Sequence, residues 1–248
     1  MKWDADRYDR DQDFVSAYGR SLETLVPAGT EALLDLGCGT GTLTAELAGR
    51  IPHVVGVDAS AEMVVRARRE HPGVEFRVAD ALDLPYDGDF DVVFSNAVFH
   101  WIPDHPRLLS TVRRALRPGG RLVCEFGAKG NIARVDAAMG RAMRRRGLDL
   151  AVRFVFPGDD EFRRNLERAG FHGIDVGSYD RPTPLGGGEA GLSSWLRQFH
   201  ADDLARVDED ERRTIITEVE EGLRDDLWDA ARGCWIADYR RLRAVAVR

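Results

Sequence analysis

Residues 33–41 have the sequence Leu-Leu-Asp-Leu-Gly-Cys-Gly-Thr-Gly, which is the strongest structural signal in the chain. The apolar run before the glycines predicts a short strand over Glu31–Leu36, and the leucine spacing after them predicts a helix over Thr42–Gly49. The alternating glycines let the backbone turn sharply and approach a ligand without interference from a Cβ atom. Because a helix follows, backbone N–H groups are available there for a polar ligand. The motif favours a nucleotide-type site; the alternative is a tight strand-to-helix turn that binds nothing.

The chain keeps alternating between predicted strands and helices as far as Phe126. Further strands are expected at His53–Val57, Val74–Val78, Phe90–Ser95 and Arg121–Phe126, with helices at Ala61–Glu70 and Arg107–Leu116. The segment Phe90–Ser95 is apolar at nearly every position, which is typical of a strand covered on both faces. This alternation predicts an α/β fold with a parallel sheet built from right-handed βαβ units.

After Gly127 the pattern becomes mainly helical. Helices are expected at Asn131–Arg146, Asp160–Ala169, Leu192–Leu204 and Glu209–Arg232, with strands at Ile174–Tyr179 and Tyr239–Val247 and a loop over residues 181–188. The final strand is indicated by small or apolar residues that alternate with arginines.

Acidic residues end two of the predicted strands. Asp58 follows the second strand, and in doubly wound folds an acidic residue roughly 20 positions beyond the glycines accepts hydrogen bonds from ribose hydroxyls. The alternative is a helix N-cap, but Ser60 is the better cap, so Asp58 is expected to be free for a ligand. Asp80 ends the third strand. Both residues belong to the carboxyl edge of the sheet, where open α/β sheets bind ligands.

Length and composition exclude several classes of protein. The 248 residues suffice for one large domain, and 35 basic against 42 acidic residues give a net charge of −7, which argues against a nucleic-acid partner. No apolar run approaches the roughly 20 residues of a membrane span, and the start of the chain has no signal-peptide pattern, so we expect a cytoplasmic protein without membrane contact. Cys38, Cys124 and Cys234 form neither a disulfide framework nor a zinc pattern, and no metal site is expected.

Five segments in order resemble the class I S-adenosylmethionine-dependent methyltransferases. They are LLDLGCGTGTLTAEL (33–47), VVGVDAS (54–60) followed by Met63, VADALDLP (78–85), FDVVFSNAVFHWIPD (90–104) and LRPGGRLVCEF (116–126). The sequence His-Trp-Ile-Pro at 100–103 is most similar to small-molecule enzymes of the trans-aconitate and juvenile-hormone-acid methyltransferase type. The glycine spacing, G-x-G-x-G followed by Thr42, differs from the G-x-G-x-x-G of dehydrogenases.

The resemblance implies S-adenosyl-L-methionine as cofactor, S-adenosyl-L-homocysteine as product, and a role for each matching residue. Gly37, Cys38 and Gly39 would pass under the methionine and ribose, with Asp35 orienting the loop, and Asp58 would hold the ribose hydroxyls. Ala59 and Met63 would border the adenine, Asp80 would accept from its amine with Ala81 and Leu82 beside it, and the Asn96-Ala97 backbone would face the methionine amine. Tyr8, Phe14 and Tyr18 would form a lid over the cofactor.

The family also implies a domain organisation. The fold would be a seven-stranded, mostly parallel Rossmann-like sheet with helices on both faces and an antiparallel last strand. Residues 1–248 would form one methyltransferase domain, with an N-terminal lid at 1–30, a cofactor-binding core at 31–126, and cap insertions at 127–160 and 181–237 that form a helical substrate cap.

The candidates for chemistry at the acceptor are His100 and Trp101. Methyl transfer from a sulfonium is an in-line displacement, which can be driven mainly by positioning. A carboxylate acceptor needs no base at neutral pH, whereas a hydroxyl benefits from one. His100 is either that base or a core histidine, and Trp101 either donates its indole N–H to a substrate carboxylate or only packs.

We therefore expect O-methylation of a carboxylate or hydroxyl on a small-molecule acceptor. Two other functions stay open from the sequence. A nucleotide-dependent oxidoreductase would bind NAD(H) in place of S-adenosylmethionine, and a non-catalytic regulatory protein would bind the cofactor without turnover. Specificity for the acceptor does not follow from the fold.

Overall fold

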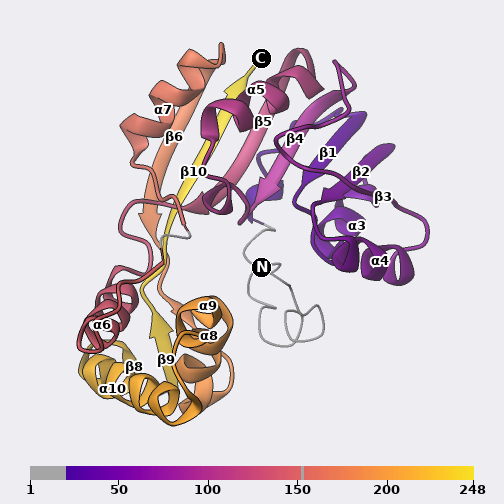
Figure 1. The fold of residues 1–248 in the computed structure, drawn as a ribbon. Coiled ribbons are helices and arrows are strands. Elements are labelled where there is room, and N and C mark those ends of the chain that lie inside the picture. Colours follow the sequence, from indigo (N-terminus) through magenta and orange to yellow (C-terminus); the bar gives the residue numbers. More distant parts are fainter. Residues whose placement is uncertain (1–20, 152–153) are drawn as a thin grey trace. The chain divides into compact units, whose positions relative to one another are not determined.

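The computed structural model describes residues 21–151 and 154–248 of the chain (Figure 1). The described residues form two compact units. The first, here called the sheet unit, comprises the described residues up to Ala128 together with Phe154–Ser178 and Arg241–Arg248. The second unit comprises the described part of Lys129–Arg153 and Tyr179–Arg240.

A seven-stranded sheet of order β3-β2-β1-β4-β5-β10-β6 forms the centre of the first unit. Its strands are β1 (Ala32–Leu36), β2 (His53–Asp58), β3 (Glu75–Val78), β4 (Phe90–Asn96), β5 (Leu116–Gly127), β6 (His172–Asp180) and β10 (Arg240–Val247). The first five pair in parallel, and β10, the last strand of the chain, is antiparallel to β5. The predicted mostly parallel sheet with an antiparallel last strand is confirmed.

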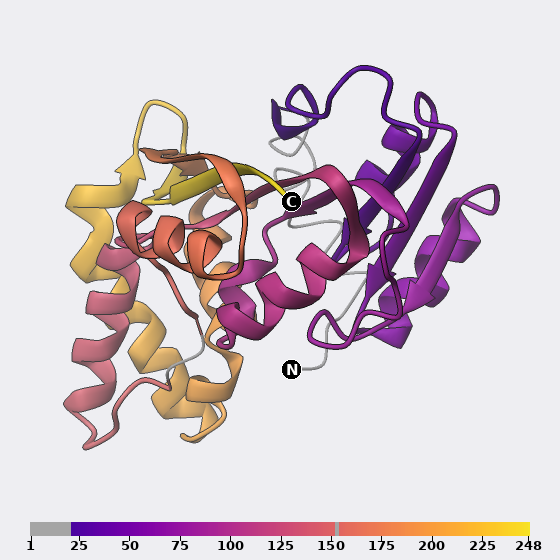
Figure 2. The same ribbon diagram turned by 90° about the horizontal axis from the view of Figure 1, so that it is seen from above.

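Helices cover both faces of this sheet (Figures 1 and 2). They are α3 (Thr42–Ala48), α4 (Ala61–Glu70), the 3-10 helix η1 (Phe99–Trp101), α5 (His105–Ala115) and α7 (Asp159–Arg168). Successive residues of a strand point to opposite faces, so Leu33 packs with Leu43 and Leu47 of α3, whereas Leu34 belongs to the cluster that holds α5 and α7. All five residues of β1 are buried, as expected for a strand covered on both sides.

The second unit is partly helical and contains a small sheet that the sequence did not predict. Its helices are α6 (Ala133–Arg144), α8 (Gly191–Phe199), α9 (Ala201–Leu204), α10 (Glu209–Leu227) and the 3-10 helix η2 (Gly188–Ala190). The sheet pairs β7 (Thr183–Pro184), β9 (Cys234–Ala237) and β8 (Trp228–Asp229) in antiparallel.

Three sequence predictions are corrected here. The helix predicted over Leu192–Leu204 is interrupted at His200, which separates α8 from α9, and the helix predicted over Glu209–Arg232 ends at Leu227 because Trp228 pairs with Trp235 in the small sheet. The strand β3 ends at Val78, so Asp80 lies in the loop that follows it. Among the described helices, none combines the length and the apolar character that a membrane crossing requires.

Candidate active site

The glycine turn after β1 is held by the neighbouring strand. The backbone N–H groups of Gly37 and Cys38 donate to the carbonyl of Val57 in β2, at 2.7 and 3.0 Å. Gly37 and Gly41 have φ angles of +78° and +85°, in the left-handed region that glycine adopts without strain. A Cβ atom on Gly37 would lie 2.2 Å from Cγ2 of Val98, so this position accepts only glycine.

Gly39 differs from the other glycines of the turn. Its φ is +55°, but a Cβ atom built there would meet no atom of residues 21–151 and 154–248 within 4 Å. Gly39 therefore borders open space rather than a packed neighbour. A ligand can therefore approach the backbone at this position.

Asp58, the last residue of β2, ties this turn to the next helix. Its Oδ2 accepts from the Gly39 N–H at 3.0 Å and its Oδ1 from the Ser60 N–H at 2.8 Å. Ser60 caps α4 as predicted, with its Oγ accepting from the Met63 N–H at 3.3 Å. The prediction that Asp58 is free for a ligand is wrong in part, since both oxygens already accept one backbone hydrogen bond. Each oxygen keeps a second lone pair for a ligand hydroxyl.

Burial controls the titration of the carboxyls near the turn. Desolvation raises the pKa of Asp58, against the opposing effect of its two backbone donors. Asp35 is almost completely buried, and its Oδ2 accepts from the Thr44 hydroxyl at 2.6 Å. Burial raises the pKa of Asp35 to about 7, with the Thr44 hydrogen bond acting in the other direction. Asp35 thus joins β1 to α3 beneath the turn.

A cavity of about 290 Å³ opens at the carboxyl ends of β1, β2 and β4. Its walls contain ten of the predicted site residues: Gly37, Gly39, Asp58, Ala59, Met63, Asp80, Ala81, Asn96, Ala97 and Trp101. Asp35, Cys38, Leu82 and His100 do not line it, and Tyr8, Phe14 and Tyr18 lie outside the described residues. The structure adds five apolar wall residues that the sequence analysis missed, namely Leu36, Val57, Ala79, Val98 and Ile102. Each of the five is the immediate sequence neighbour of a predicted site residue. That adjacency is the signal that could have identified it.

The loop after β3 places Asp80 at the cavity wall. Its Oδ1 accepts from the Leu82 N–H at 2.9 Å, which closes a tight turn. Leu82 itself packs against the hydrophobic core, and its carbonyl accepts from the Arg107 side chain at 3.0 Å. The polar residue of this pair therefore faces the cavity, and the apolar one anchors the loop.

The end of β4 carries a strained residue. Ala97 has a φ of +61°, which a residue with a Cβ atom rarely adopts, and its N–H donates to the carbonyl of Glu125 at 2.7 Å. The Glu125 side chain is buried and pairs with Arg243 at 2.6 Å. These two contacts of Glu125 fix the direction of the backbone that follows Asn96, next to the cavity.

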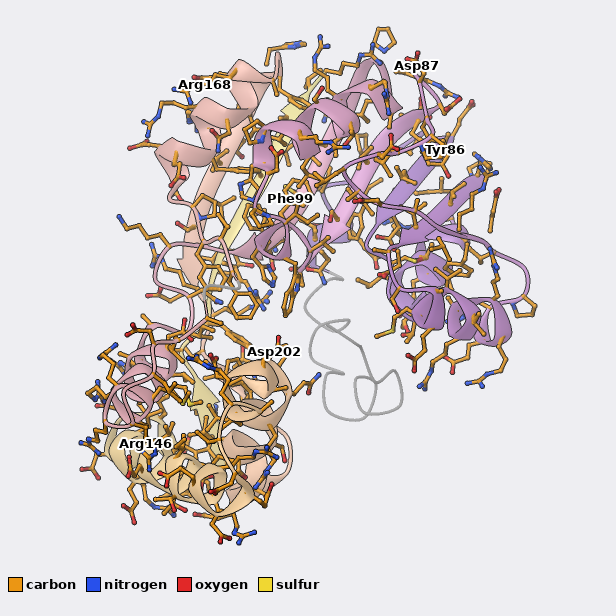
Figure 3. The ribbon with its side chains drawn as sticks, viewed as in Figure 1. Tyr86, Asp87, Phe99, Arg146, Arg168 and Asp202 are labelled. Atoms are coloured by element: carbon orange, nitrogen blue, oxygen red, sulfur yellow. The ribbon has the colours of Figure 1, made fainter. Side chains whose placement is uncertain are left out.

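His100 and Trp101, one after the other in η1, have different surroundings. Trp101 lines the cavity, and its ring packs edge-on against Phe154, with the ring centroids 4.6 Å apart. His100 is buried, and its Nδ1 accepts from the Gly127 N–H at 3.3 Å. Burial, followed by the positive charge of Arg241, holds the pKa of His100 well below its usual value, so the ring is neutral at pH 7. Phe99, labelled in Figure 3, packs against Phe126 and anchors η1 in the core.

Comparison with known proteins identifies the family to which the chain belongs. A model of the methyltransferase domain matches residues 34–124. An uncharacterized methyltransferase of Schizosaccharomyces pombe is 33% identical over 98% of this chain and 97% of its own length. The chain belongs to the class I S-adenosylmethionine-dependent methyltransferases.

Two further comparisons concern parts of this methyltransferase and its fold. Trans-aconitate 2-methyltransferase of Deinococcus radiodurans is 43% identical over 132 residues, which are 52% of this chain and 50% of that protein, so the match spans about half of each. A phosphoethanolamine N-methyltransferase of Haemonchus contortus, solved with phosphomonomethylethanolamine and S-adenosylhomocysteine, is similar in fold. It has 20% identity and a TM-score of 0.58, over 94% of this chain and 52% of that one.

The cavity of this methyltransferase fits its cofactor, S-adenosylmethionine. The open space beside Gly39 admits a ligand against the backbone, and the carboxylates of Asp58 and Asp80 can accept hydrogen bonds from hydroxyl and amino groups. In the same cavity, the side chains of Ala59, Met63 and Ala81 provide the apolar surface that a purine ring requires.

Proposed function

We propose that this methyltransferase transfers the methyl group to a carboxylate oxygen of a small organic acid. The observation that carries the proposal is the chemistry of the cavity wall. Of the described residues that line it, only Asp58 and Asp80 carry an acidic or basic side chain; Asp58 ends β2, and Asp80 lies in the loop after β3. The other residues that line the cavity present glycine backbone, apolar side chains, the Asn96 amide and the Trp101 indole.

An acceptor that needs deprotonation would require a base near this wall. His100 is outside the cavity lining, and its Nδ1 already accepts from Gly127. A carboxylate with a pKa near 4 is ionised at neutral pH and attacks without losing a proton. The wall therefore favours a carboxylic acid over an alcohol, phenol or amine, which would have to give up a proton during or after attack.

The cofactor contacts follow from the positions of the wall residues. We assign the ribose hydroxyls to Asp58 and the adenine amine to Asp80, since these carboxylates can only accept hydrogen bonds. Ala59, Met63 and Ala81 border the adenine, Leu82 supports them from the core, and the Gly37–Gly39 backbone supports the methionine and ribose. Asp35 orients this turn through Thr44.

The methyl-transfer end of the site is assigned to the Asn96-Ala97 backbone and to Trp101. When bound, the cofactor would supply a methyl group activated by the sulfonium; the acceptor oxygen would bond to that methyl carbon in line as the carbon–sulfur bond breaks, with S-adenosylhomocysteine as the leaving group. The Asn96-Ala97 turn, fixed by Glu125, orients the methionine amine, and Trp101 donates its indole N–H to the acceptor carboxylate. Catalysis then comes from orientation and from the exclusion of water by the apolar wall. The selection of the acceptor by residues 127–160 and 181–237 stays a prediction.

The test is an acceptor screen with methyl-labelled S-adenosylmethionine. Carboxylic acids, phenols and primary amines are incubated separately, and each labelled product is then treated with mild base. A methyl ester releases labelled methanol, whereas an ether or an N-methyl group keeps the label. We expect base-labile label from the acids alone. Base-stable label from phenols or amines, with none from acids, would contradict the proposal.

A further inference from the structure

The Trp101 indole projects into the cavity wall from a short stretch of fixed backbone. The Trp101 N–H donates to the carbonyl of Val98 at 2.9 Å, and the Ile102 N–H donates to that of Phe99 at 3.1 Å. These bonds close the 3-10 helix η1 and fix the point at which the Trp101 side chain leaves the backbone. They do not fix its χ2 torsion, which is broad in tryptophan because it joins an sp3 carbon to an sp2 carbon. The plane of the indole must therefore be set by side chains packed against it.

Phe154 supplies such a contact. Its ring is edge-on to that of Trp101, with the ring centroids 4.6 Å apart and an interplanar angle of 66°. Rings attract in this geometry because the positive edge of one meets the negative face of the other, so the contact favours an angle as well as a distance. Trp101 lines the cavity, whereas Phe154 is not among the described residues that line it. Phe154 can therefore act on a ligand in the cavity only through its neighbour.

The segment that carries Phe154 is itself fastened to η1. The Val155 N–H donates to the carbonyl of His100 at 2.9 Å. Phe156 stacks on Phe154, with the ring centroids 5.3 Å apart, and the His100 ring lies 5.7 Å from the first of these two rings along the chain and 5.8 Å from the second. The Phe154 ring is thus held by one backbone hydrogen bond beside it and by a second ring stacked on it.

We propose that Phe154 is a positioning residue, which sets the plane of the Trp101 indole and thereby the orientation in which the acceptor meets the methyl group. This assignment rests on the proposed role of Trp101 as an acceptor contact. An aliphatic side chain at position 154 would fill part of the same space without the edge-to-face preference, so the indole would sample a wider range of planes. Turnover of the acceptor depends on that orientation, whereas binding of the cofactor does not.

The experiment is a double-mutant cycle of Phe154→Leu and Trp101→Leu in the full chain. It uses the acceptor that gives the most labelled product in the screen with methyl-labelled S-adenosylmethionine. Phe154→Leu should lower kcat/KM for that acceptor by roughly three- to tenfold and leave the affinity for S-adenosylhomocysteine unchanged. The same change should have little effect in Trp101→Leu, because the ring that it positions is gone.

Two further variants separate positioning from a general loss of packing. Phe154→Tyr keeps the ring and should retain the wild-type kcat/KM. Phe156→Leu is the matched control, since it removes a ring of the same size that stacks on Phe154 and lies as near to His100. It should lower kcat/KM by no more than about twofold, because the edge-on contact with Trp101 remains.

The mobility of the Trp101 indole is measured without any acceptor. Its N–H signal is identified by its absence in Trp101→Leu, and its NMR order parameter is determined in the chain saturated with S-adenosylhomocysteine. The order parameter should fall in Phe154→Leu and stay near the wild-type value in Phe154→Tyr and Phe156→Leu. An unchanged order parameter in folded Phe154→Leu would by itself overturn the positioning role. An equal loss of kcat/KM in the Trp101→Leu background, or a loss that tyrosine does not restore, would do the same.

The label separates this proposal from the proposed function. A base-labile product whose rate of formation is the same in wild type and Phe154→Leu supports carboxylate methylation and refutes the positioning role. A base-stable product from a phenol or an amine, formed at a rate that depends on Phe154 only when Trp101 is present, supports the positioning role and refutes carboxylate methylation.

Discussion

The Asp58 carboxylate accepts a hydrogen bond from the backbone N–H of Gly39 at 3.0 Å. One side chain thereby links the end of β2 to the glycine turn after β1, and both residues line the cavity. A ligand that binds Asp58 is thus held against a turn whose position the same carboxylate sets. Cofactor recognition and the shape of the turn are coupled through this contact.

Asp58→Ala should weaken S-adenosylhomocysteine binding by roughly tenfold or more, because it removes both a ligand acceptor and the partner of Gly39. Calorimetric titration measures the affinity directly. Asp83→Ala is the matched control, since Asp83 is exposed in the loop after β3. Unchanged affinity in Asp58→Ala would exclude the ribose assignment.

Gly39→Ala and Gly37→Ala should separate binding from stability. A Cβ atom at position 39 meets no atom of the described part of the chain within 4 Å, so the alanine should cost only about 1 kcal/mol for its left-handed backbone while its Cβ blocks the cofactor. At position 37 the Cβ would lie 2.2 Å from Val98, and the protein itself should be destabilised by a few kcal/mol, roughly as in other overpacked sites. Chemical denaturation and cofactor titration of both variants check this. Normal cofactor affinity in Gly39→Ala would mean that the cofactor does not lie against the backbone of residue 39.

The fold could be predicted because the central strands β1 and β4 are apolar at nearly every position and the strands alternate with helices at regular spacing. It also located Asp58 and Asp80, because parallel strands bring their carboxyl ends to one edge whatever their order. It did not identify wall residues such as Val57 and Val98, whose apolar side chains look the same in a core and in a cavity. The small sheet was missed because β7 and β8 have two residues each, too few for any periodicity.

The sequence also could not predict that Trp101 lines the cavity whereas His100 does not. Both stand in a three-residue 3-10 helix, and only its orientation puts one ring in the cavity wall and the other behind it. That orientation depends on the packing of Phe99 against Phe126 and Phe162, which are distant in sequence.

Asp35 should make the stability of the fold depend on pH. Its pKa is raised to about 7 in the folded chain, from the ordinary value of 3.8. Between these two values the folded state holds a proton that the unfolded state has lost, so the free energy of unfolding should fall as pH rises from about 4 to about 7 and stay level above that. Asp35→Asn keeps a neutral hydrogen-bonding side chain and should remove this slope.

Denaturant unfolding of wild type and Asp35→Asn at pH 5 and pH 8 measures the effect. The difference in the free energy of unfolding between the two proteins should shift in favour of the variant at the higher pH, by no more than roughly 3 kcal/mol, since only the interval from pH 5 to about 7 contributes. Because Asp58 is present in both proteins, the difference reports on Asp35 together with its electrostatic interaction with Asp58. Parallel behaviour of the two proteins would show that Asp35 ionises as readily in the folded chain as in the unfolded one.

His100→Gln tests whether the reaction uses a base. Because burial and Arg241 lower the pKa of His100, a catalytic imidazole would be neutral and active at pH 7, and its replacement would reduce kcat by roughly a hundredfold or more. A structural histidine needs only to accept from the Gly127 N–H, and the glutamine carbonyl can do the same. Since a carboxylate acceptor attacks without losing a proton, we expect kcat within about threefold of wild type and a kcat/KM that is flat from pH 6.5 to 8 in both proteins. A hundredfold loss of kcat with unchanged cofactor affinity would assign the proton transfer to His100, and the acceptor would then be a hydroxyl.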